Sequence, residues 1–335
     1  MNERITFNTQ SAELKNKVLA FIEEWNSTAE TIVVNTSGST GTPKKTEILK
    51  SHMVISAKKT LNYFALKPGD TALLCLSPET IAGKMMIVRS IVGDLNLVVS
   101  DVNSTPLKNC DHHIDFIALV PLQVEELLKT DSEKLKSIQT ILIGGGPIST
   151  SISTELRNKN IQAYHSYGMT ETISHVAIRK VGTEETESFE ALNGIEFSQE
   201  NGQLRVHYPE IGYSNLATND LVELIDNHHF KFIGRADFII NSGGIKINPE
   251  KVEELLSTHI ETSFFVSGIP DEQLGQRLIL LIEGTITQAP TLFELKSLLP
   301  KFNNPKEIYF LQKFIRTESG KINRLETLKL ISIES

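Results

Sequence analysis

The sequence predicts an α/β protein with a doubly wound sheet, because three features of the chain agree. Short β-branched runs alternate with longer segments of helical period from about residue 31 onward. Glycine-rich segments follow two of the predicted strands, at the position where open α/β sheets bind ligands. The last part of the chain then changes to elements of another spacing. We expect a large N-terminal domain over residues 1–236, with the doubly wound sheet and a small β-meander or barrel, and a smaller mobile α+β C-terminal domain over residues 237–335.

The alternation can be followed element by element. Residues 32–34 form the first predicted strand. Ser51 can cap a helix, because apolar residues recur after it at three- and four-residue spacing from Val54 to Phe64. Further strands are predicted at 73–76, 95–99, 116–120 and 140–143, and further helices at 81–91 and 122–128. This order is typical of parallel strands joined by helices.

After Tyr164 the pattern changes. Short strands are predicted at 203–207, 221–225 and 230–233, and Asp226-Asn227 indicates a tight turn between the last two. The acidic segment from Val181 to Ala191 predicts an exposed loop. Beyond Asp237, a helix begins at Pro249, and the remaining elements are strands at 264–266, 278–282 and 308–311 and a helix at 292–299.

The bulk properties exclude several classes of protein. The 335 residues carry a formal net charge of −8, which gives no basic footprint for nucleic acid or an anionic membrane. Residues 1–10 lack the apolar core of a signal peptide, and no stretch approaches the ~20 apolar residues that span a bilayer. We therefore expect a cytoplasmic protein with no nucleic-acid or membrane partner. Cys75 and Cys110 lack metal-ligand spacing and are expected to be buried free thiols.

A loop rich in glycine and hydroxyl groups follows the first predicted strand and precedes a helix. It reads Thr36-Ser37-Gly38-Ser39-Thr40-Gly41-Thr42-Pro43-Lys44. Glycines allow close approach of the backbone to a ligand, hydroxyl and N–H groups bind phosphate oxygens, and Lys44 adds positive charge. The loop is not a Walker A motif, because Pro43 stands where the second glycine would be needed. A phosphate-binding loop of another class is favoured over a flexible linker.

Further segments downstream carry polar and glycine residues in a fixed order. They are Gly144-Gly145-Gly146-Pro147; Ser166-Tyr167-Gly168-Met169-Thr170-Glu171-Thr172; Thr218-Asn219-Asp220; Gly234-Arg235-Ala236-Asp237; residues 241–247 with Gly243, Gly244 and Lys246; and Ser319-Gly320-Lys321-Ile322-Asn323-Arg324. Each one alone has an ordinary structural explanation, such as a turn, a surface ion pair or an exposed lysine. Their joint occurrence is far more specific.

Together these segments resemble the motifs of the adenylate-forming superfamily of acyl-CoA synthetases, adenylation domains and luciferases. The resemblance implies an enzyme that uses ATP, Mg²⁺ and coenzyme A and joins a carboxylic acid to a thiol through an acyl-adenylate. It implies that the loop from Thr36 to Lys44, Gly144 to Gly146 and Ser166 to Met169 bind the nucleotide, with the Tyr167 ring on the adenine. Thr170 and Glu171 would act at the phosphates, with Glu171 as the metal ligand.

The same resemblance assigns roles near the domain boundary and beyond it. Asp220 would bind the ribose hydroxyls, although Asn219 replaces the usual glycine. Arg235 would lie near the ribose, and Asp237 would be the pivot of the small domain. Lys321 would be the catalytic lysine of the first half-reaction. Gly243 and Gly244, with Lys246 in the same segment, would then be presented to the pantetheine arm for the second.

Within the superfamily the chain most resembles the o-succinylbenzoate:CoA ligases of menaquinone biosynthesis. This rests on residues 166–172, 144–147, 120–123 and the helix over 83–89. The resemblance implies that Arg89 pairs with the succinyl carboxylate of the acid; the alternative is an exposed helix charge. Family members carry the phosphate loop much further along the chain, so we expect most of the N-terminal subdomain to be missing here.

Three functions remain open on this evidence. They are an o-succinylbenzoate ligase, another aryl or acyl ligase or a free-standing adenylation domain that loads a carrier protein, and a nucleotide-binding module without catalysis. The oligomeric state is also open, and a homodimer is one alternative.

Overall fold

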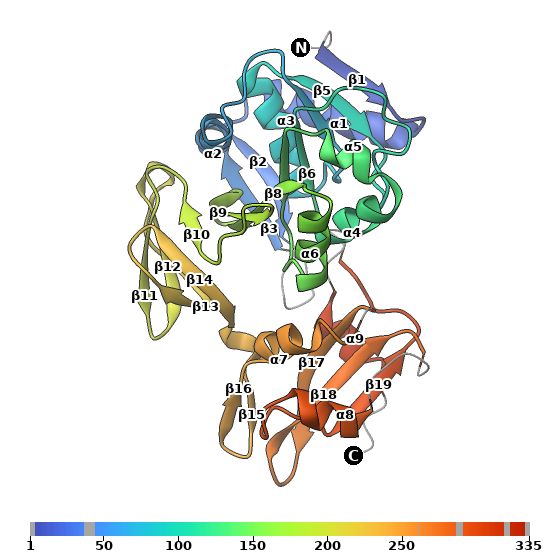
Figure 1. Cartoon of the computed structure of the whole chain (residues 1–335). Helices are drawn as coiled ribbons and strands as arrows, with labels where there is room; N and C mark the ends of the chain where they lie inside the picture. Colours follow the sequence, from blue (N-terminus) through green and yellow to red (C-terminus); the bar gives the residue numbers. More distant parts are fainter. Residues whose placement is uncertain (1–3, 37–43, 261, 286–290, 318–321, 332–335) are drawn as a thin grey trace.

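A computed structural model gives the structure of the chain and describes residues 4–36, 44–260, 262–285, 291–317 and 322–331. Figure 1 shows a larger upper part and a smaller lower part. The large sheet ends with a strand that stops at Arg235, and the second sheet begins at Ile240. The α/β class is confirmed, and the domain boundary at Asp237 stays a prediction.

A twelve-stranded sheet among the described residues forms the upper part. Its first half is parallel throughout, as predicted for a doubly wound sheet. In spatial order these strands are β1 (Ile5–Asn8), β5 (Asn96–Ser100), β4 (Thr71–Leu74), β6 (Phe116–Leu119), β7 (Thr140–Ile143) and β8 (Gln162–Gly168).

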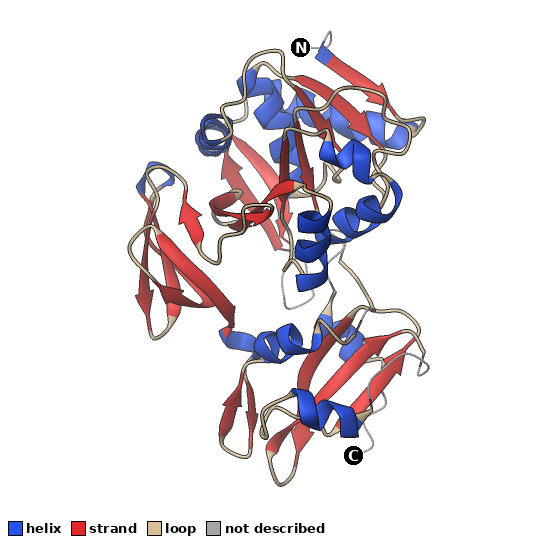
Figure 2. Ribbon diagram, viewed as in Figure 1, coloured by secondary structure: helices blue, strands red, loops and turns tan. Residues whose placement is uncertain are grey.

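Helices cover both faces of this parallel half (Figure 2). One face packs against α1 (Ala12–Asn26), α2 (Lys50–Tyr63) and α3 (Ile81–Gly93), and the other against α4 (Pro121–Thr130), α5 (Ser132–Lys136) and α6 (Thr150–Asn158). The division follows from the alternation of side chains along a strand. Leu74 belongs to the first apolar core and its neighbour Leu73 to the second.

The second half of the sheet is antiparallel and follows the order β9 (His175–Gly182), β10 (Phe189–Ala191), β14 (His229–Arg235), β13 (Tyr213–Leu224), β12 (Gln203–Tyr208) and β11 (Glu196–Glu200). It is an open meander and not a barrel, since among the described strands β11 pairs only with β12. The predicted turn between β13 and β14 is confirmed: Asp226 Oδ1 accepts hydrogen bonds from the backbone N–H groups of His228 and His229.

The lower part has its own sheet and helices. Its strands are β15 (Ile240–Ser242), β16 (Ile245–Ile247), β17 (Phe264–Asp271), β18 (Gly275–Glu283) and β19 (Glu307–Leu311), and its helices are α7 (Pro249–Leu256), α8 (Leu292–Leu298) and α9 (Arg324–Leu328). Leu280 faces the apolar core under α7 and α8, and Leu281 faces a second apolar cluster with Phe314. Both faces of this sheet are therefore covered.

The structure differs from the strand, loop and helix predicted around the phosphate loop. Strand β2 (Thr31–Thr36) does not join the large sheet but pairs antiparallel with β3 (Lys44–Leu49). Burial alternates along residues 45–49, with Ile48 buried between exposed Glu47 and Leu49. Such an alternation is typical of a strand, which was not predicted here. Helix α2 begins at Lys50 after the N-cap Leu49, so Ser51 is not the cap.

Several further elements were missed by the prediction, among them β1, α1 and β10. Strand β1 and helix α1 precede its starting point at residue 31. Strand β10 lies within the acidic segment that was predicted to be a loop, and it connects the antiparallel strands β9 and β14 through Glu190 and Phe189. Of the helices described, none has the length and apolar character to cross a membrane.

Candidate active site

Two predicted motifs lie largely outside the described residues. They are the loop residues Ser37, Gly38, Ser39, Thr40 and Gly41, and the segment with Lys321. The backbone on both sides of the first is described: Thr36 and Lys44 are directly paired at the ends of β2 and β3. The second is followed by Ile322, which forms an antiparallel bridge with Arg316.

The motif from Ser166 to Thr172 forms the end of β8 and the turn into β9. Gly168 pairs with His175, and a Cβ atom at Gly168 would lie 2.2 Å from the Ser174 carbonyl oxygen, so only glycine fits there. The Thr172 hydroxyl closes the turn, since it accepts from the Met169 N–H at 2.9 Å and donates to the Ser174 carbonyl at 2.7 Å. This tight loop leaves the Glu171 side chain exposed and Thr170 partly exposed.

Tyr167 and Asp220 meet although they are 53 residues apart in the sequence. The Tyr167 hydroxyl donates to Asp220 Oδ2, and the ring packs edge-on against Phe230. Burial and the nearby Asp220 carboxylate raise the pKa of Tyr167 well above its usual value, so the hydroxyl keeps its proton. The half-buried ring and the largely buried carboxylate form one side of the candidate nucleotide site.

Arg235 connects this pair to the predicted pivot. Its Nη1 atom lies 3.5 Å from Asp220 Oδ1, and its Nε and Nη2 atoms donate to the two Asp237 oxygens at 2.8 and 2.7 Å. Such a two-pronged pair fixes both side chains. The structure therefore brings together three of the predicted segments, at Tyr167, Asp220 and Arg235-Asp237.

The predicted glycine loop Gly144 to Gly146 follows β7 and lies beside Ser166. The Ser166 hydroxyl donates to the Ile143 carbonyl at 3.1 Å, and a Cβ atom at Gly144 would lie 2.7 Å from Ser166 Oγ. Gly145 has a φ of +84°, a conformation that favours glycine. The loop and the Tyr167 motif are thus neighbours, as the sequence predicts.

His165 holds this glycine loop and was not predicted from the sequence. Arg179 Nε–H donates to His165 Nδ1 at 3.2 Å, so the ring proton sits on Nε2, which lies 3.0 Å from the Gly146 carbonyl and donates to it. Burial and the Arg179 charge lower the pKa of His165 to about 3, which keeps the ring neutral. A polar residue next to a predicted strand-end motif is the only sequence signal for this role.

Arg89 on α3 is buried, not exposed, and only 2% of its surface is accessible. Nε donates to Thr60 Oγ1 at 3.1 Å and Nη2 donates to Ser174 Oγ at 2.7 Å. None of the carboxylates in the described part of the chain forms an ion pair with it. Burial lowers the pKa of Arg89 to about 9. The exposed-charge explanation is therefore wrong.

The small-domain glycines are not brought to this cluster. Gly243 and Gly244 form the turn between β15 and β16, with φ values of +57° and +80°, and Lys246 is exposed on β16. In Figure 1 this hairpin extends away from the upper part, whereas α7 and α9 lie on the side that faces it. The predicted thiol-step residues and the nucleotide cluster are separate in this arrangement.

Helix α7 contacts the end of β14 beside the predicted pivot. Asn248 Nδ2 donates to the Ile233 carbonyl at 3.0 Å, and Glu250 Oε1 accepts from the Arg235 N–H at 3.3 Å. Within the described part of the structure, Glu250 Oε2 is buried without a hydrogen-bond partner. Burial raises the pKa of Glu250 to about 7. These bonds join the two parts across Asp237.

The terminal motif also contacts the pivot region through Arg324. Its Nη2 atom donates to Glu253 Oε2 on α7 at 2.7 Å, and its guanidinium lies 5.0 Å from the ring centre of Phe238, the residue after Asp237. The residues that follow Lys321 are thus tied to the predicted hinge.

The residues present fit ATP with Mg²⁺ at the Thr170-Glu171 turn. In the described part of the chain there is no cluster of three His, Cys, Asp or Glu side chains that could hold a metal by itself. A single exposed carboxylate suits Mg²⁺, which keeps waters and binds substrate phosphates through one or two carboxylates. A metal ion bound at this turn would be held by this carboxylate together with the phosphates of the nucleotide.

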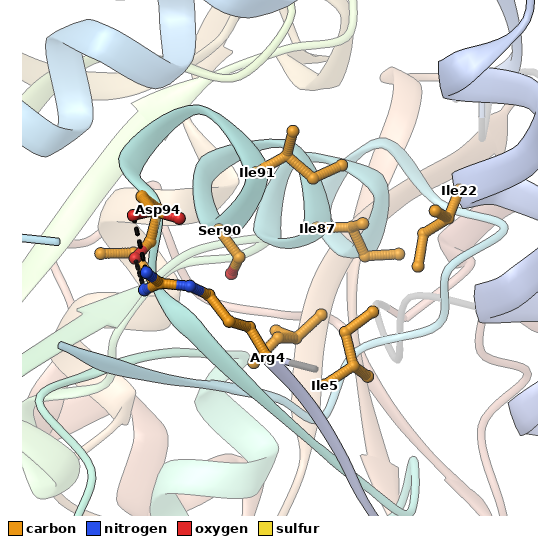
Figure 3. A pocket seen from close by; sticks show the side chains of 9 residues that line it. Arg4, Ile5, Ile22, Ile87, Ser90, Ile91 and Asp94 are labelled. Atoms are coloured by element: carbon orange, nitrogen blue, oxygen red, sulfur yellow. Dashed lines mark hydrogen bonds and ion pairs between the residues drawn. The ribbon is translucent and has the colours of Figure 1, made fainter. Parts of the chain in front are cut away.

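Two surface cavities contain none of the predicted site residues. The first, of about 170 Å³, lies between β1, α1 and α3 and is bordered by the exposed Arg4–Asp94 ion pair (Figure 3). The second, of about 270 Å³, is lined by Cys110, His112 and Lys134 among others. Neither belongs to the candidate active site.

Comparison with known sequences places the chain among AMP-binding enzymes. Residues 7–195, more than half of the chain, match the sequence profile of the family described as AMP-binding enzyme. A 2-succinylbenzoate–CoA ligase of Bacillus mycoides (strain KBAB4) is 27% identical over 354 residues, covering 94% of this chain and 73% of the relative. The enzyme of the same name from Listeria monocytogenes serotype 4b (strain F2365) is 28% identical over 346 residues, covering 93% and 73%.

Solved structures share the fold. An acyl-CoA synthetase (AMP-forming)/AMP-acid ligase II-like protein from Dyadobacter fermentans DSM 18053 is 34% identical, with 95% of this chain and 94% of that protein covered and a TM-score of 0.64. The O-succinylbenzoate coenzyme A synthetase of Bacillus subtilis, solved with ATP and a magnesium ion, is 24% identical, with 88% and 69% covered and a TM-score of 0.75. The second likeness concerns the fold alone.

Proposed function

Because the chain belongs to the AMP-binding enzyme family, we propose that it is an AMP-forming acyl-CoA ligase whose acid carries a second carboxylate, with o-succinylbenzoate as its substrate. The reaction would take ATP, Mg²⁺ and coenzyme A. The carboxylate of the acid first displaces pyrophosphate from ATP, and the thiol of coenzyme A then displaces AMP from the acyl-adenylate.

One observation carries the proposal for the acid. Arg89 is a buried guanidinium with hydroxyl partners and, within the described residues, no carboxylate partner. An uncompensated buried charge costs several kcal/mol, so it persists where a ligand supplies the counter-charge. Arg89 binds Ser174, which follows the Thr170-Glu171 turn by three residues, so an acid held by Arg89 would lie beside that turn. A dicarboxylate fits this arrangement.

The nucleotide would be held by the cluster around Tyr167. Asp220 would accept hydrogen bonds from the ribose hydroxyls, and the Tyr167 hydroxyl orients its Oδ2 atom. Arg235 would add positive charge beside the same carboxylate. Gly144 to Gly146, which His165 holds in place, would line the other side.

The first half-reaction needs alignment and positive charge. The acid oxygen attacks the α-phosphorus, a new P–O bond forms, and the bond to pyrophosphate breaks with its electrons leaving on pyrophosphate. Thr170 would donate to a phosphate oxygen, and Glu171 would hold the Mg²⁺ that supplies positive charge to the leaving group. Lys321 would place its ammonium group on the phosphate charge that develops.

The second half-reaction needs a different arrangement of the small domain. The thiol sulfur attacks the acyl carbon, its proton leaves, and AMP departs with the electrons of the cleaved C–O bond. In the proposal, rotation about Asp237 removes Lys321 and presents the Gly243-Gly244 turn, with Lys246, to the pantetheine arm. Among the described bonds, those of Asn248 and Glu250 to β14 would have to break for this rotation.

The named relatives support o-succinylbenzoate as the acid, since both curated sequences above carry that specificity in their names. The test is product analysis with ATP, Mg²⁺, coenzyme A and o-succinylbenzoate, in parallel with a panel of other aryl and alkyl acids. The expected result is o-succinylbenzoate-dependent release of pyrophosphate and formation of the CoA thioester. A preference for a monocarboxylic acid would contradict the proposed substrate, and release of pyrophosphate without a CoA thioester would point to a carrier protein as the acceptor.

A further inference from the structure

A histidine that the predicted motifs do not include completes a ring of hydrogen bonds around Arg89. His175 is the first residue of β9, and 6% of its surface is accessible. Its Nε2 atom lies 3.2 Å from Thr60 Oγ1, and its Nδ1 atom lies 3.2 Å from Ser174 Oγ. These are the same two hydroxyl oxygens that accept from Arg89, so Arg89, Thr60, His175 and Ser174 form a closed cycle.

We propose that His175 is a positioning residue for the acid: it fixes the Thr60 and Ser174 hydroxyls so that the Arg89 guanidinium faces the second carboxylate of the substrate. The proposal rests on the proposed function, since it assigns Arg89 to the acid. It adds a residue that determines specificity. This residue comes from a third element, since Thr60 lies on α2, Arg89 on α3 and His175 on β9.

The chemistry of the cycle explains why a histidine suits this place. Both hydroxyl oxygens must accept from Arg89, because a guanidinium has donors only. The Thr60 hydroxyl donates its own proton to the Ser56 carbonyl at 3.3 Å. The neutral imidazole, with one donor and one acceptor, therefore donates from Nε2 to Thr60 Oγ1 and accepts at Nδ1 from the Ser174 hydroxyl. Burial and the Arg89 charge lower the pKa of His175 well below its usual value, which keeps the ring neutral.

The cycle also leaves one part of Arg89 without a strong partner. Nε and Nη2 donate to the hydroxyls, whereas the one hydrogen-bond acceptor of Nη1 among the described atoms is the sulfur of Met86, at 3.8 Å. A thioether is a weak acceptor. Nη1 and the second hydrogen of Nη2 are therefore the donors that a carboxylate would take in a two-pronged pair.

The loop that carries Ser174 links this cycle to the reaction centre. The Thr172 hydroxyl donates to the Ser174 carbonyl, and Gly168 is packed against the backbone of Ser174 and His175. A shift of His175 would move Ser174 and Arg89 together relative to Thr170 and Glu171. Loss of His175 should thus weaken recognition of the second carboxylate more than it weakens nucleotide binding.

The test compares the full-length wild type with His175→Ala, Arg89→Met and the double variant, by pyrophosphate release. The acids are o-succinylbenzoate and two analogues that each lack one carboxylate, 3-benzoylpropanoate and 2-butanoylbenzoate. We expect His175→Ala to raise the KM for o-succinylbenzoate about tenfold and to leave the KM for ATP within about twofold. One of the two analogues keeps the carboxylate that reacts with ATP and therefore still releases pyrophosphate. The kcat/KM for this reactive analogue should change little in His175→Ala. In the Arg89→Met background, His175→Ala should have no further effect.

His207→Ala is the matched control, since His207 also contacts a serine hydroxyl, that of Ser198, at 2.7 Å, but lies on β12. It should change neither KM. If His175→Ala fails to fold, Thr60→Val removes the same bridge from the other side, and the expected result is the same.

Two results would overturn the inference, and they differ from a failure of the proposed function. Equal loss of kcat/KM for o-succinylbenzoate and for the reactive analogue would show a general structural role for His175. Additive effects of His175→Ala and Arg89→Met would show that the two residues act independently. If the wild type releases no pyrophosphate with o-succinylbenzoate, the proposed substrate fails and the inference fails with it.

Discussion

Arg89 Nη2 donates a hydrogen bond to Ser174 Oγ at 2.7 Å, and these two residues belong to segments 85 positions apart. The bond joins a helix that is buried from Gly83 to Ser90 to the loop that presents Thr170 and Glu171. It makes the position of a buried cation depend on the geometry of the proposed phosphate-binding turn. Several consequences of this arrangement can be measured.

Arg89→Met should raise the KM for o-succinylbenzoate by about 10- to 100-fold, as expected when a charge-assisted pair worth ~1.5–3 kcal/mol is lost. The KM for ATP should stay within about twofold, because Arg89 contacts none of the nucleotide cluster around Tyr167. Arg89→Lys should recover little, since an ammonium cannot reproduce the fork that reaches Thr60 and Ser174. Steady-state pyrophosphate release measures both KM values for each variant.

The control for these variants is Arg157→Met, which removes an exposed arginine that pairs with Glu185 on the surface. It should alter neither constant. An unchanged KM for the acid in Arg89→Met would remove Arg89 from the acid site. Thermal unfolding supplies a second readout: Arg89→Met should not lower the melting temperature, because it removes a buried charge without an ionic partner among the described residues.

Tyr167→Phe should weaken nucleotide binding and spare the acid. The variant keeps the ring that packs on Phe230 and removes only the hydroxyl that donates to Asp220. Loss of one such bond to a charged group costs about 1.5–3 kcal/mol, or about 10- to 150-fold in the KM for ATP. Tyr63→Phe, in a ring cluster with Phe64 and Tyr164, should have no such effect. Equal KM values for ATP in wild type and Tyr167→Phe would contradict the role assigned to the Asp220 cluster.

Strands β4, β5, β6 and β7 could be predicted from the sequence, but their order in the sheet and the place of β2 could not. Strands such as Thr140–Ile143 are short apolar runs buried on both faces, and their composition alone marks them. The run at residues 31–36 has the same composition, yet it pairs with residues 44–49 in a separate hairpin. Pairing partners depend on contacts between segments, and a single period in the sequence does not encode them.

The site shows the same limit. Tyr167, Asp220 and Arg235 carry recognisable motifs and are brought together as those motifs suggest. His165 and His175 carry none, because each acts through a contact made in three dimensions, with the Gly146 carbonyl in one case and with Thr60 and Ser174 in the other. The sequence also left open that Arg89 is an exposed charge on a helix. The fold excludes this alternative, because Arg89 is buried.

Lys321→Ala should separate the two half-reactions. The lysine would serve only the step in which charge builds on the α-phosphate, so adenylate formation should fall by at least about 100-fold, as for loss of a major electrostatic group. Thioester formation from acyl-adenylate supplied in the assay should remain within a few-fold of wild type. The two steps are measured as pyrophosphate release and as CoA thioester by chromatography. An equal loss of the rates of adenylate formation and thioester formation would show that Lys321 does not serve the first step alone.

Glu250→Gln should stabilise the protein at alkaline pH and have little effect at pH 5. The carboxyl is buried beside Arg235 N–H, and its pKa is raised from 4.5 to about 7. Between these values the folded state holds a proton that the unfolded state has lost, so stability falls as pH rises through this window. The full effect is about 3 kcal/mol at most. Glutamine removes it, because the amide stays neutral and can still accept from Arg235.

The measurement is urea unfolding of wild type and Glu250→Gln at pH 5 and pH 8, with Glu272→Gln as the control, since Glu272 is exposed. The difference in unfolding free energy between the two proteins should grow from less than about 1 kcal/mol at pH 5 to about 2–3 kcal/mol at pH 8. The control should follow the wild type at both values. If the difference in unfolding free energy is the same at pH 5 and pH 8, Glu250 does not titrate between these pH values. Its effect on stability would then come from packing and from its contact with Arg235, and not from its charge.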